Sequence, residues 1–206
     1  MPLSATQKGV IGQFAFLATA LVTGNGQIEV YTPAADNEGR DAEVRRHLRR
    51  TPGIGIQVKV AFGMRKVDRR GRRTYMSVRF SIPAKMLSND PRLWFFLGVY
   101  DPHQLRLCDT CFLVPSAILL RVSRYGKSRR GIVFVIDANL APGSRDRWTP
   151  YRVALKDLGK RLLEIIDDAK LTAEVGTVPL PEGAIVIGRT RRPAARPNRN
   201  RIAHAA

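Results

Sequence analysis

The sequence places an amide, Gln57, and an ammonium, Lys59, two positions apart, a pair that could act on a phosphate together with a nearby carboxylate. In the run from Ile54 to Phe62, apolar residues recur at alternate positions, and Gln57 and Lys59 fall between them. A strand with this period of two directs Gln57 and Lys59 to one face and the branched apolar residues to the other. Packing gives no reason for this pair opposite an apolar face. With one carboxylate, the pair could hold a divalent cation and a phosphate.

The carboxylate is supplied by a second strand-like run, residues 41–48, which begins with Asp41. Between the two runs lies the breaker cluster Arg49–Gly53, which suits a short hairpin. A hairpin would bring Asp41 to the Gln57 and Lys59 side. A plainer interpretation also stands, in which Asp41 caps a turn and Gln-Val-Lys occurs by chance on a half-exposed strand.

A helix and a strand are expected ahead of these runs. Ser4 or Thr6 could cap a helix that ends before the turn signal Val22–Gly26, and residues 27–32 alternate as a strand. Because only Lys8 precedes its apolar segment, a cytosolic core helix is favoured over a secretory signal. An apolar stripe is expected to turn this helix toward the core. The stripe consists of Ile11, Phe14, Ala15, Ala18, Leu21 and Val22.

The order of these pieces resembles the PD-(D/E)XK nuclease superfamily, in its variant with Gln-x-Lys as the third motif. Within it, the chain looks most like the intron-associated homing endonucleases and related bacterial proteins. Those proteins begin with a helix carrying Gly-x-x-Gly-Glu, followed by a strand, an aspartate and a Gln-x-Lys strand. The matching pieces are Gly9–Gln13, residues 27–32, Asp41 and Gln57–Lys59, so the resemblance covers roughly residues 7 to 62.

The resemblance implies an α/β (α+β) protein with a PD-(D/E)XK-like restriction-endonuclease fold, a mixed central sheet flanked by helices. It also implies an endonuclease, a hydrolase that cuts phosphodiester bonds with Mg²⁺. Asp41 would bind the ion together with a backbone carbonyl near Val58. Lys59 would hold the scissile phosphate or orient a water, and Gln57 would fix that lysine or the water.

The chain departs from the family where the helix glutamate falls on Gln13, a neutral amide. Two carboxylates hold Mg²⁺ better than one, so this departure bears on activity. In one class of function the protein is an active nuclease, with Gln13 at the catalytic helix position and Glu43, on the same strand face as Asp41, as replacement metal ligand. In the other class it binds nucleic acid or another partner without cutting. A basic scaffold protein of unrelated fold is the remaining alternative.

Charge and length favour a nucleic-acid partner. The chain has 206 residues, 35 Lys and Arg against 17 Asp and Glu, a net charge of +18 and a pI of about 11.1. Such a field attracts polyanions, DNA in particular, although a ribosome-like protein or a membrane-surface binder has a similar composition. No run approaches the roughly 20 apolar residues of a membrane span, so no membrane partner is expected. The chain could pair as a homodimer, and a cytoplasmic location is expected.

Residues 1–175 are expected to form the nuclease-fold domain, and residues 176–206 a C-terminal extension. The extension ends in a tail, 189–201, that has six arginines and little to bury, so disorder is expected. The tail could bind phosphate or merely solubilise the chain. A basic loop, 65–73, is the other expected contact. The candidate nucleic-acid contacts are Arg65, Lys66, Arg69, Arg70, Arg72, Arg73, Arg191 and Arg192.

The remaining segments are expected to be strands at 74–82, 93–100, 109–114 and 131–138, one helical turn at 84–88, and helices at 116–122 and 156–169. Cys108 and Cys111 are too few for a four-ligand zinc site and lead into a strand, so two reduced, partly buried thiols are favoured. Trp148 and Tyr151 alternate with arginines and could stack on bases. A Trp148 that locks its loop against the core is the favoured alternative.

Overall fold

The computed structural model describes residues 2–33, 39–48, 53–64, 66–67, 73–83, 90–128, 131–141 and 143–172. Within these ranges the strands form two sheets. The larger sheet has the order β1-β2-β3-β6-β8-β11, with β7 paired to β6, and the smaller sheet has the order β4-β5-β10-β9. In the larger sheet, β3 and β6 pair in parallel and the other strand pairs are antiparallel, so this sheet is mixed. The expected α+β class with a mixed central sheet is therefore confirmed.

The helices are α1 (Ala5–Thr23), α2 (Ser116–Val122) and α3 (Leu158–Thr172). The strands of the larger sheet are β1 (Ile28–Tyr31), β2 (Ala42–Arg46), β3 (Ile54–Phe62), β6 (Leu93–Asp101), β7 (Arg106–Leu107), β8 (Thr110–Pro115) and β11 (Arg152–Ala154). The strands of the smaller sheet are β4 (Lys66–Val67), β5 (Arg73–Ile82), β9 (Arg124–Ser128) and β10 (Gly131–Asn139). The element types expected within the described ranges are thus present close to their expected bounds.

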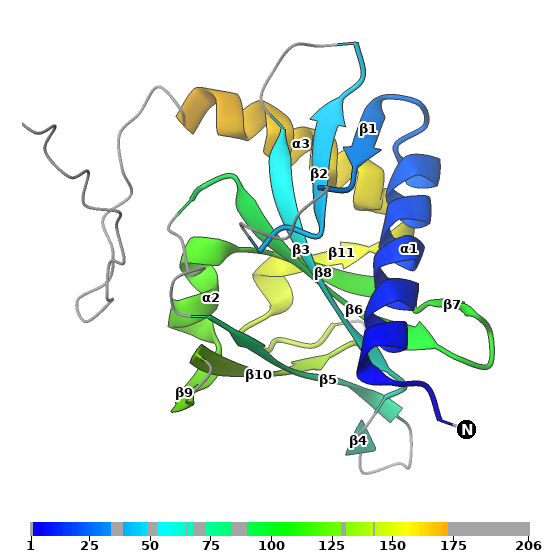
Figure 1. Ribbon diagram of the computed structural model, residues 1–206, viewed down its shortest axis with the longest axis vertical. Coiled ribbons are helices and arrows are strands. Elements are labelled where there is room, and N and C mark those ends of the chain that lie inside the picture. The colour runs from blue at the N-terminus through cyan, green and yellow to red at the C-terminus, as the bar shows by residue number, and fades with distance from the viewer. Residues whose placement is uncertain are drawn as a thin grey trace, which may run out of the picture.

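β3 lies inside the larger sheet and separates two apolar cores. One face of β3, with Ile54 and Ile56, packs against α1 and α3. The other face of the sheet, through Phe95 and Leu97 of β6, packs against β5, β10 and α2. In Figure 1, α1 lies along one side of the larger sheet. The smaller sheet, which contains β5 and β10, lies on another side. The division into two stacked sheets was not predicted, because strand patterns do not say which strands pair.

The start of α1 follows from its first residues. The Gln7 backbone N–H donates to Ser4 Oγ at 3.2 Å, and the Ser4 N–H donates to Gln7 Oε1 at 2.9 Å. This reciprocal capping box satisfies donors that would otherwise lack an intrahelical partner. Further along, a Cβ at Gly12 would lie 2.9 Å from the Cβ of Val60, so glycine is what lets α1 approach β3 this closely.

The predicted inward stripe of α1 is wrong. The buried residues are Gly12, Phe16 and Ala20, whereas the side chains of Phe14 and Val22 are 66% and 79% exposed. The reason is that α1 is apolar on nearly every side, so periodicity could not identify its inner face. Small residues on either side of Phe16 allow the closest packing, and that face is the one that turns to β3. In α3, by contrast, the four predicted core residues are all buried, namely Leu158, Leu162, Ile165 and Ile166.

Several expectations lie outside the described residues. They are the hairpin turn at 49–52, the turn at 84–88, the domain boundary at 175 and the extension 176–206 with its arginine tail. In the part of the chain that the structure describes, no helix is long and apolar enough to cross a bilayer.

Candidate functional site

The carboxylate of Asp41 is held by the neighbouring strand at one oxygen. Gln57 Nε2 donates to Asp41 Oδ2 at 2.6 Å, and the backbone N–H of Val58 donates to the same atom at 2.7 Å. The backbone of Asp41 is fixed as well, because its N–H donates to the carbonyl of Ile56 at 2.9 Å. Among the described residues no donor reaches Oδ1. The two bonds to Oδ2 therefore fix the orientation of the Asp41 carboxylate against β3.

The β2–β3 pairing explains this contact. Ala42 lies opposite Ile56 in the antiparallel register, so Asp41 begins the hairpin beside Gln57. Because side chains alternate along each strand, Asp41 and Gln57 share the face away from α1. Lys59, two residues further along β3, lies on that face too. The structure thus brings Asp41, Gln57 and Lys59 to one side of the sheet.

Lys59 and Gln57 line a small cavity between β3 and β5. Gln57 is only 7% exposed, and Lys59 Nζ lies 5.8 Å from the ring centroid of Phe80. The cavity has a volume of about 100 Å³, which admits a few water molecules. Its other lining residues are Gly39, Ser81, Ile82, Pro83, Leu93 and Phe95. A cation and an amide thus face a small polar space on the Asp41 side of β3.

Gln13 approaches Asp41 from α1, but it contacts the backbone. Its Nε2 donates to the Asp41 carbonyl oxygen at 2.7 Å. A glutamate could not make this contact when ionised, because a carboxylate accepts hydrogen bonds and cannot donate them. In this chain, position 13 therefore holds Asp41 in place through its backbone.

Glu43 is engaged elsewhere. Its Oε1 accepts from Arg45 Nε at 2.8 Å, in an ion pair on the exposed side of β2. Within the described ranges, no group of three His, Cys, Asp or Glu side chains gathers in a way that could hold a metal. Asp41 does not line the cavity itself, but Gln57, which does, donates a hydrogen bond to its carboxylate.

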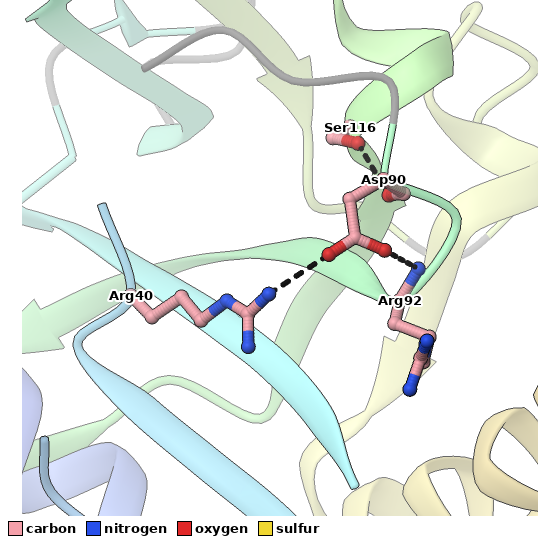
Figure 2. A network of polar contacts seen from close by, with 4 residues as sticks. All are labelled: Arg40, Asp90, Arg92 and Ser116. Atoms are coloured by element: carbon pink, nitrogen blue, oxygen red, sulfur yellow. Dashed lines mark hydrogen bonds and ion pairs between the residues drawn. The ribbon is translucent and has the colours of Figure 1, made fainter. Parts of the chain in front are cut away.

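A second network of polar contacts lies beside the site and was not predicted from the sequence. Figure 2 shows Arg40, which precedes Asp41, reaching Asp90 ahead of β6. Arg40 Nη2 lies 2.8 Å from Asp90 Oδ2, the Arg92 N–H donates to Asp90 Oδ1 at 2.8 Å, and Ser116 Oγ donates to the Asp90 carbonyl at 3.0 Å. The Arg40 side chain crosses Gly55, where a Cβ would lie 2.6 Å from Arg40 Cδ. A glycine inside an apolar strand was the available signal, because such glycines often mark close approach of another group.

The predicted basic contacts fall almost entirely outside the described residues. Lys66 begins β4 and Arg73 begins β5, and these two strands pair antiparallel in the smaller sheet. The other candidates lie beyond the described ranges, namely Arg65, Arg69, Arg70, Arg72, Arg191 and Arg192. Their role in binding stays a prediction.

The other sequence candidates have structural positions. Trp148 is completely buried in the core between the sheets, so its ring is closed to a base. Cys108 and Cys111 are free thiols. Burial raises the pKa of Cys111 to about 12 and, as the largest cause, also raises the pKa of Cys108. Both thiols are therefore poor nucleophiles at neutral pH.

Comparisons with known proteins show a likeness of structure but none of sequence. No family model matches the sequence, and no curated protein matches it. The chain is similar to a solved structure described as "The structure of a bacterial homing endonuclease: I-Ssp6803I", with 16% identity and a TM-score of 0.48. The match covers 84% of this chain and 99% of that chain.

Proposed function

We propose that the protein binds nucleic acid, DNA in particular, and presents a phosphodiester to a site of the PD-(D/E)XK type formed by Asp41, Gln57 and Lys59. The observation that carries the proposal is the fixed Asp41 carboxylate, with Oδ2 held by Gln57 and Val58 and Oδ1 available. Lys59 adds a cation on the same face, beside the cavity. The net charge of +18 would bring a polyanion to the molecule.

Mg²⁺ is the cofactor that such a site would use. Proteins often hold Mg²⁺ with one or two carboxylates together with substrate phosphates. Asp41 Oδ1 offers one carboxylate oxygen, while Glu43 is paired with Arg45 and Gln13 is neutral. The residues therefore fit the ion weakly, with substrate phosphate completing its ligands. When bound, Mg²⁺ would polarise a phosphoryl oxygen and lower the pKa of a coordinated water.

The protein's own residues have distinct tasks in this proposal. Asp41 would hold the ion through Oδ1, with a backbone carbonyl near Val58 as a second ligand. Lys59 would balance the charge of the scissile phosphate from the cavity side. Gln57, whose amide already donates to Asp41, would keep the carboxylate oriented, and Gln13 would keep the Asp41 backbone in place. In this scheme Gln57 and Gln13 are positioning residues.

A second function, binding without cleavage, is favoured by one specific contact. Gln13 Nε2 donates to the Asp41 carbonyl, so this chain uses the helix position for structure where the family places a charge. With a single carboxylate, Mg²⁺ affinity and cleavage are expected to be low. The two functions share the same site and differ in whether the bound phosphodiester is cut.

Binding is tested with labelled DNA and RNA duplexes over a series of salt concentrations. Affinity should fall steeply with salt, because side chains that neutralise phosphates release counterions. Lys59→Ala should weaken binding more than Lys160→Ala, which removes the same charge from an exposed position on α3. Equal losses would mean that the Lys59 cavity takes no part. Removal of residues 189–206 should weaken binding across all sequences and make the salt slope shallower.

Cleavage is tested with Mg²⁺ on the same substrates. Robust cleavage by the unmodified chain that is lost in Asp41→Asn would support the nuclease. Gln13→Glu restores the family's charge and should raise Mg²⁺ affinity in calorimetry, at the expense of the hydrogen bond to Asp41. If that variant cleaves, Lys59→Ala in the same background should abolish the activity. No cleavage by either chain, with binding intact, would support the non-catalytic function.

A further inference from the structure

The side chain of Arg40 occupies the place that a side chain at position 55 would take on β3. Gly55, Gln57 and Lys59 lie at alternate positions of this strand, so they share the face that carries the proposed site. A Cβ at Gly55 would lie 2.6 Å from Arg40 Cδ and 2.8 Å from Arg40 Nε. The Arg40 side chain therefore lies over β3 on the same face as Gln57 and Lys59.

The end of the Arg40 side chain is anchored by Asp90, which other groups hold in place. Arg40 Nη2 lies 2.8 Å from Asp90 Oδ2, and the two side chains are 29% and 27% exposed. The Arg92 N–H donates to Asp90 Oδ1 at 2.8 Å, and Ser116 Oγ donates to the Asp90 carbonyl at 3.0 Å (Figure 2). Because these two contacts do not involve Arg40, Asp90 is a fixed point to which Arg40 attaches.

The Arg40–Asp90 ion pair joins two walls of the small cavity between β3 and β5. Gly39, the residue before Arg40, lines that cavity, and so does Leu93, which begins β6 shortly after Asp90. Asp41, the residue after Arg40, supplies the carboxylate of the proposed site. The ion pair therefore ties the segment that contains Gly39 and Asp41 to the start of β6.

We propose that Arg40 and Asp90 are positioning residues of the proposed site, and that their ion pair holds the Asp41 segment against β6. The backbone of Asp41 is already tied to β3 through Ile56 and to α1 through Gln13. β6 is the parallel neighbour of β3, and the ion pair adds a tie to the residues that lead into it. The proposal rests on the proposed function, since it assigns a task in the site that takes the phosphodiester. The tie itself can be measured without nucleic acid.

The first measurement is amide hydrogen exchange in the free chain, followed by NMR at Val58. The pairing of β2 with β3 ends at Ile56, and the Val58 N–H donates to the Asp41 carboxylate. Exchange of this N–H therefore reports how firmly Asp41 is held. Arg40→Gln and Asp90→Ala should each speed it about fivefold, the scale of a partly exposed ion pair.

The matched control is Arg45→Gln. It breaks an ion pair of the same length, 2.8 Å from Arg45 Nε to Glu43 Oε1, on the exposed side of β2. Exchange at Val58 should not change in this variant. Exchange in β10 should not change in any variant, because faster exchange there would mean that the whole fold has loosened.

The second measurement is the affinity for a DNA duplex without Mg²⁺. Arg40→Gln removes a positive charge, so its weaker binding alone does not separate positioning from direct contact with phosphate. Asp90→Ala removes a negative charge, yet it should also weaken binding, by about threefold, because it releases Arg40. The double variant should bind no more weakly than Arg40→Gln, since residues that act as one unit do not have additive effects.

Three outcomes decide between the alternatives. If Asp90→Ala binds DNA as tightly as the unmodified chain, or more tightly, the ion pair does not position the site and the proposal is wrong. Unchanged exchange at Val58 in both variants would overturn it as well. If the unmodified chain binds no DNA while exchange at Val58 is faster in both variants, the proposed function fails and the tie between Arg40 and Asp90 is supported.

Discussion

The two faces of β3 are both covered, but different interactions hold them. Toward α1, Ile54, Ile56 and Val58 pack against apolar side chains such as Phe16. On the opposite face, Gln57 is 7% exposed and depends on a specific acceptor, Asp41 Oδ2. Apolar packing tolerates substitutes of similar volume, whereas a buried amide needs a partner atom at one place. The first face should therefore govern stability, and the second should govern chemistry.

The largest effect on stability is expected on the apolar face. Ile56→Ala removes a side chain with 0% exposure and should lower the free energy of unfolding by about 2–5 kcal/mol, since it leaves a cavity in a packed core. Urea unfolding measures the loss. DNA affinity per folded molecule should not change. If binding falls while stability is retained, the two faces are not separable in this way.

Asp41→Ala should have the next largest effect on stability, and unlike Ile56→Ala it should also abolish metal binding. It leaves Gln57 Nε2 and the Val58 N–H without their acceptor, which should cost about 1–3 kcal/mol. Asp41→Asn keeps an oxygen acceptor and should lose less stability. Both variants should lose Mg²⁺ binding in calorimetry. If Asp41→Asn binds Mg²⁺ with unchanged affinity, Asp41 is not a ligand of the ion.

A smaller effect is expected where the Arg40 side chain crosses β3. A Cβ in Gly55→Ala would meet Arg40 and push it from Asp90, with a loss of about 1 kcal/mol because this ion pair is partly exposed. Gly9→Ala is the control, since nothing lies within 4 Å of its Cβ and alanine should stabilise the helix by about 0.5–1 kcal/mol. Arg40→Ala should add little to Gly55→Ala. Additive losses would show that Gly55 does not act through Arg40.

The smallest effect concerns the two thiols. Burial holds the pKa of Cys111 at about 12, so the folded state keeps the thiol protonated where the unfolded chain ionises, above about pH 8.5. Its contribution to stability is full below that pH and is lost as pH rises toward 12. Mass spectrometry after iodoacetamide treatment at pH 8 should find Cys108 modified before Cys111. Preferential modification of Cys111 would mean that the core opens readily.

Parts of this fold were predictable because the local pattern and the tertiary environment agree. Alternation of apolar residues defined Ile54–Phe62, and the breaker cluster before it predicted the hairpin that seats Asp41 against Gln57. The inner face of α1 was not predictable, since an all-round apolar helix has no preferred side. The Arg40–Asp90 contact joins positions 50 residues apart, and Gly55 signals only that some group approaches β3 closely, without saying which one. The roles of the site residues remain predictions.

The parallel pairing of β3 with β6 has a consequence for synthesis of the chain. Asp41, Gln57 and Lys59 all lie before residue 62, yet one edge of β3 is completed by Leu93–Tyr100. Until the ribosome has released that segment, β3 has an open apolar edge of the kind that recruits other strands. Contacts so distant in sequence also form slowly. The emerging chain should therefore need protection from aggregation until β6 has emerged, and a fragment that ends at residue 62 should not fold.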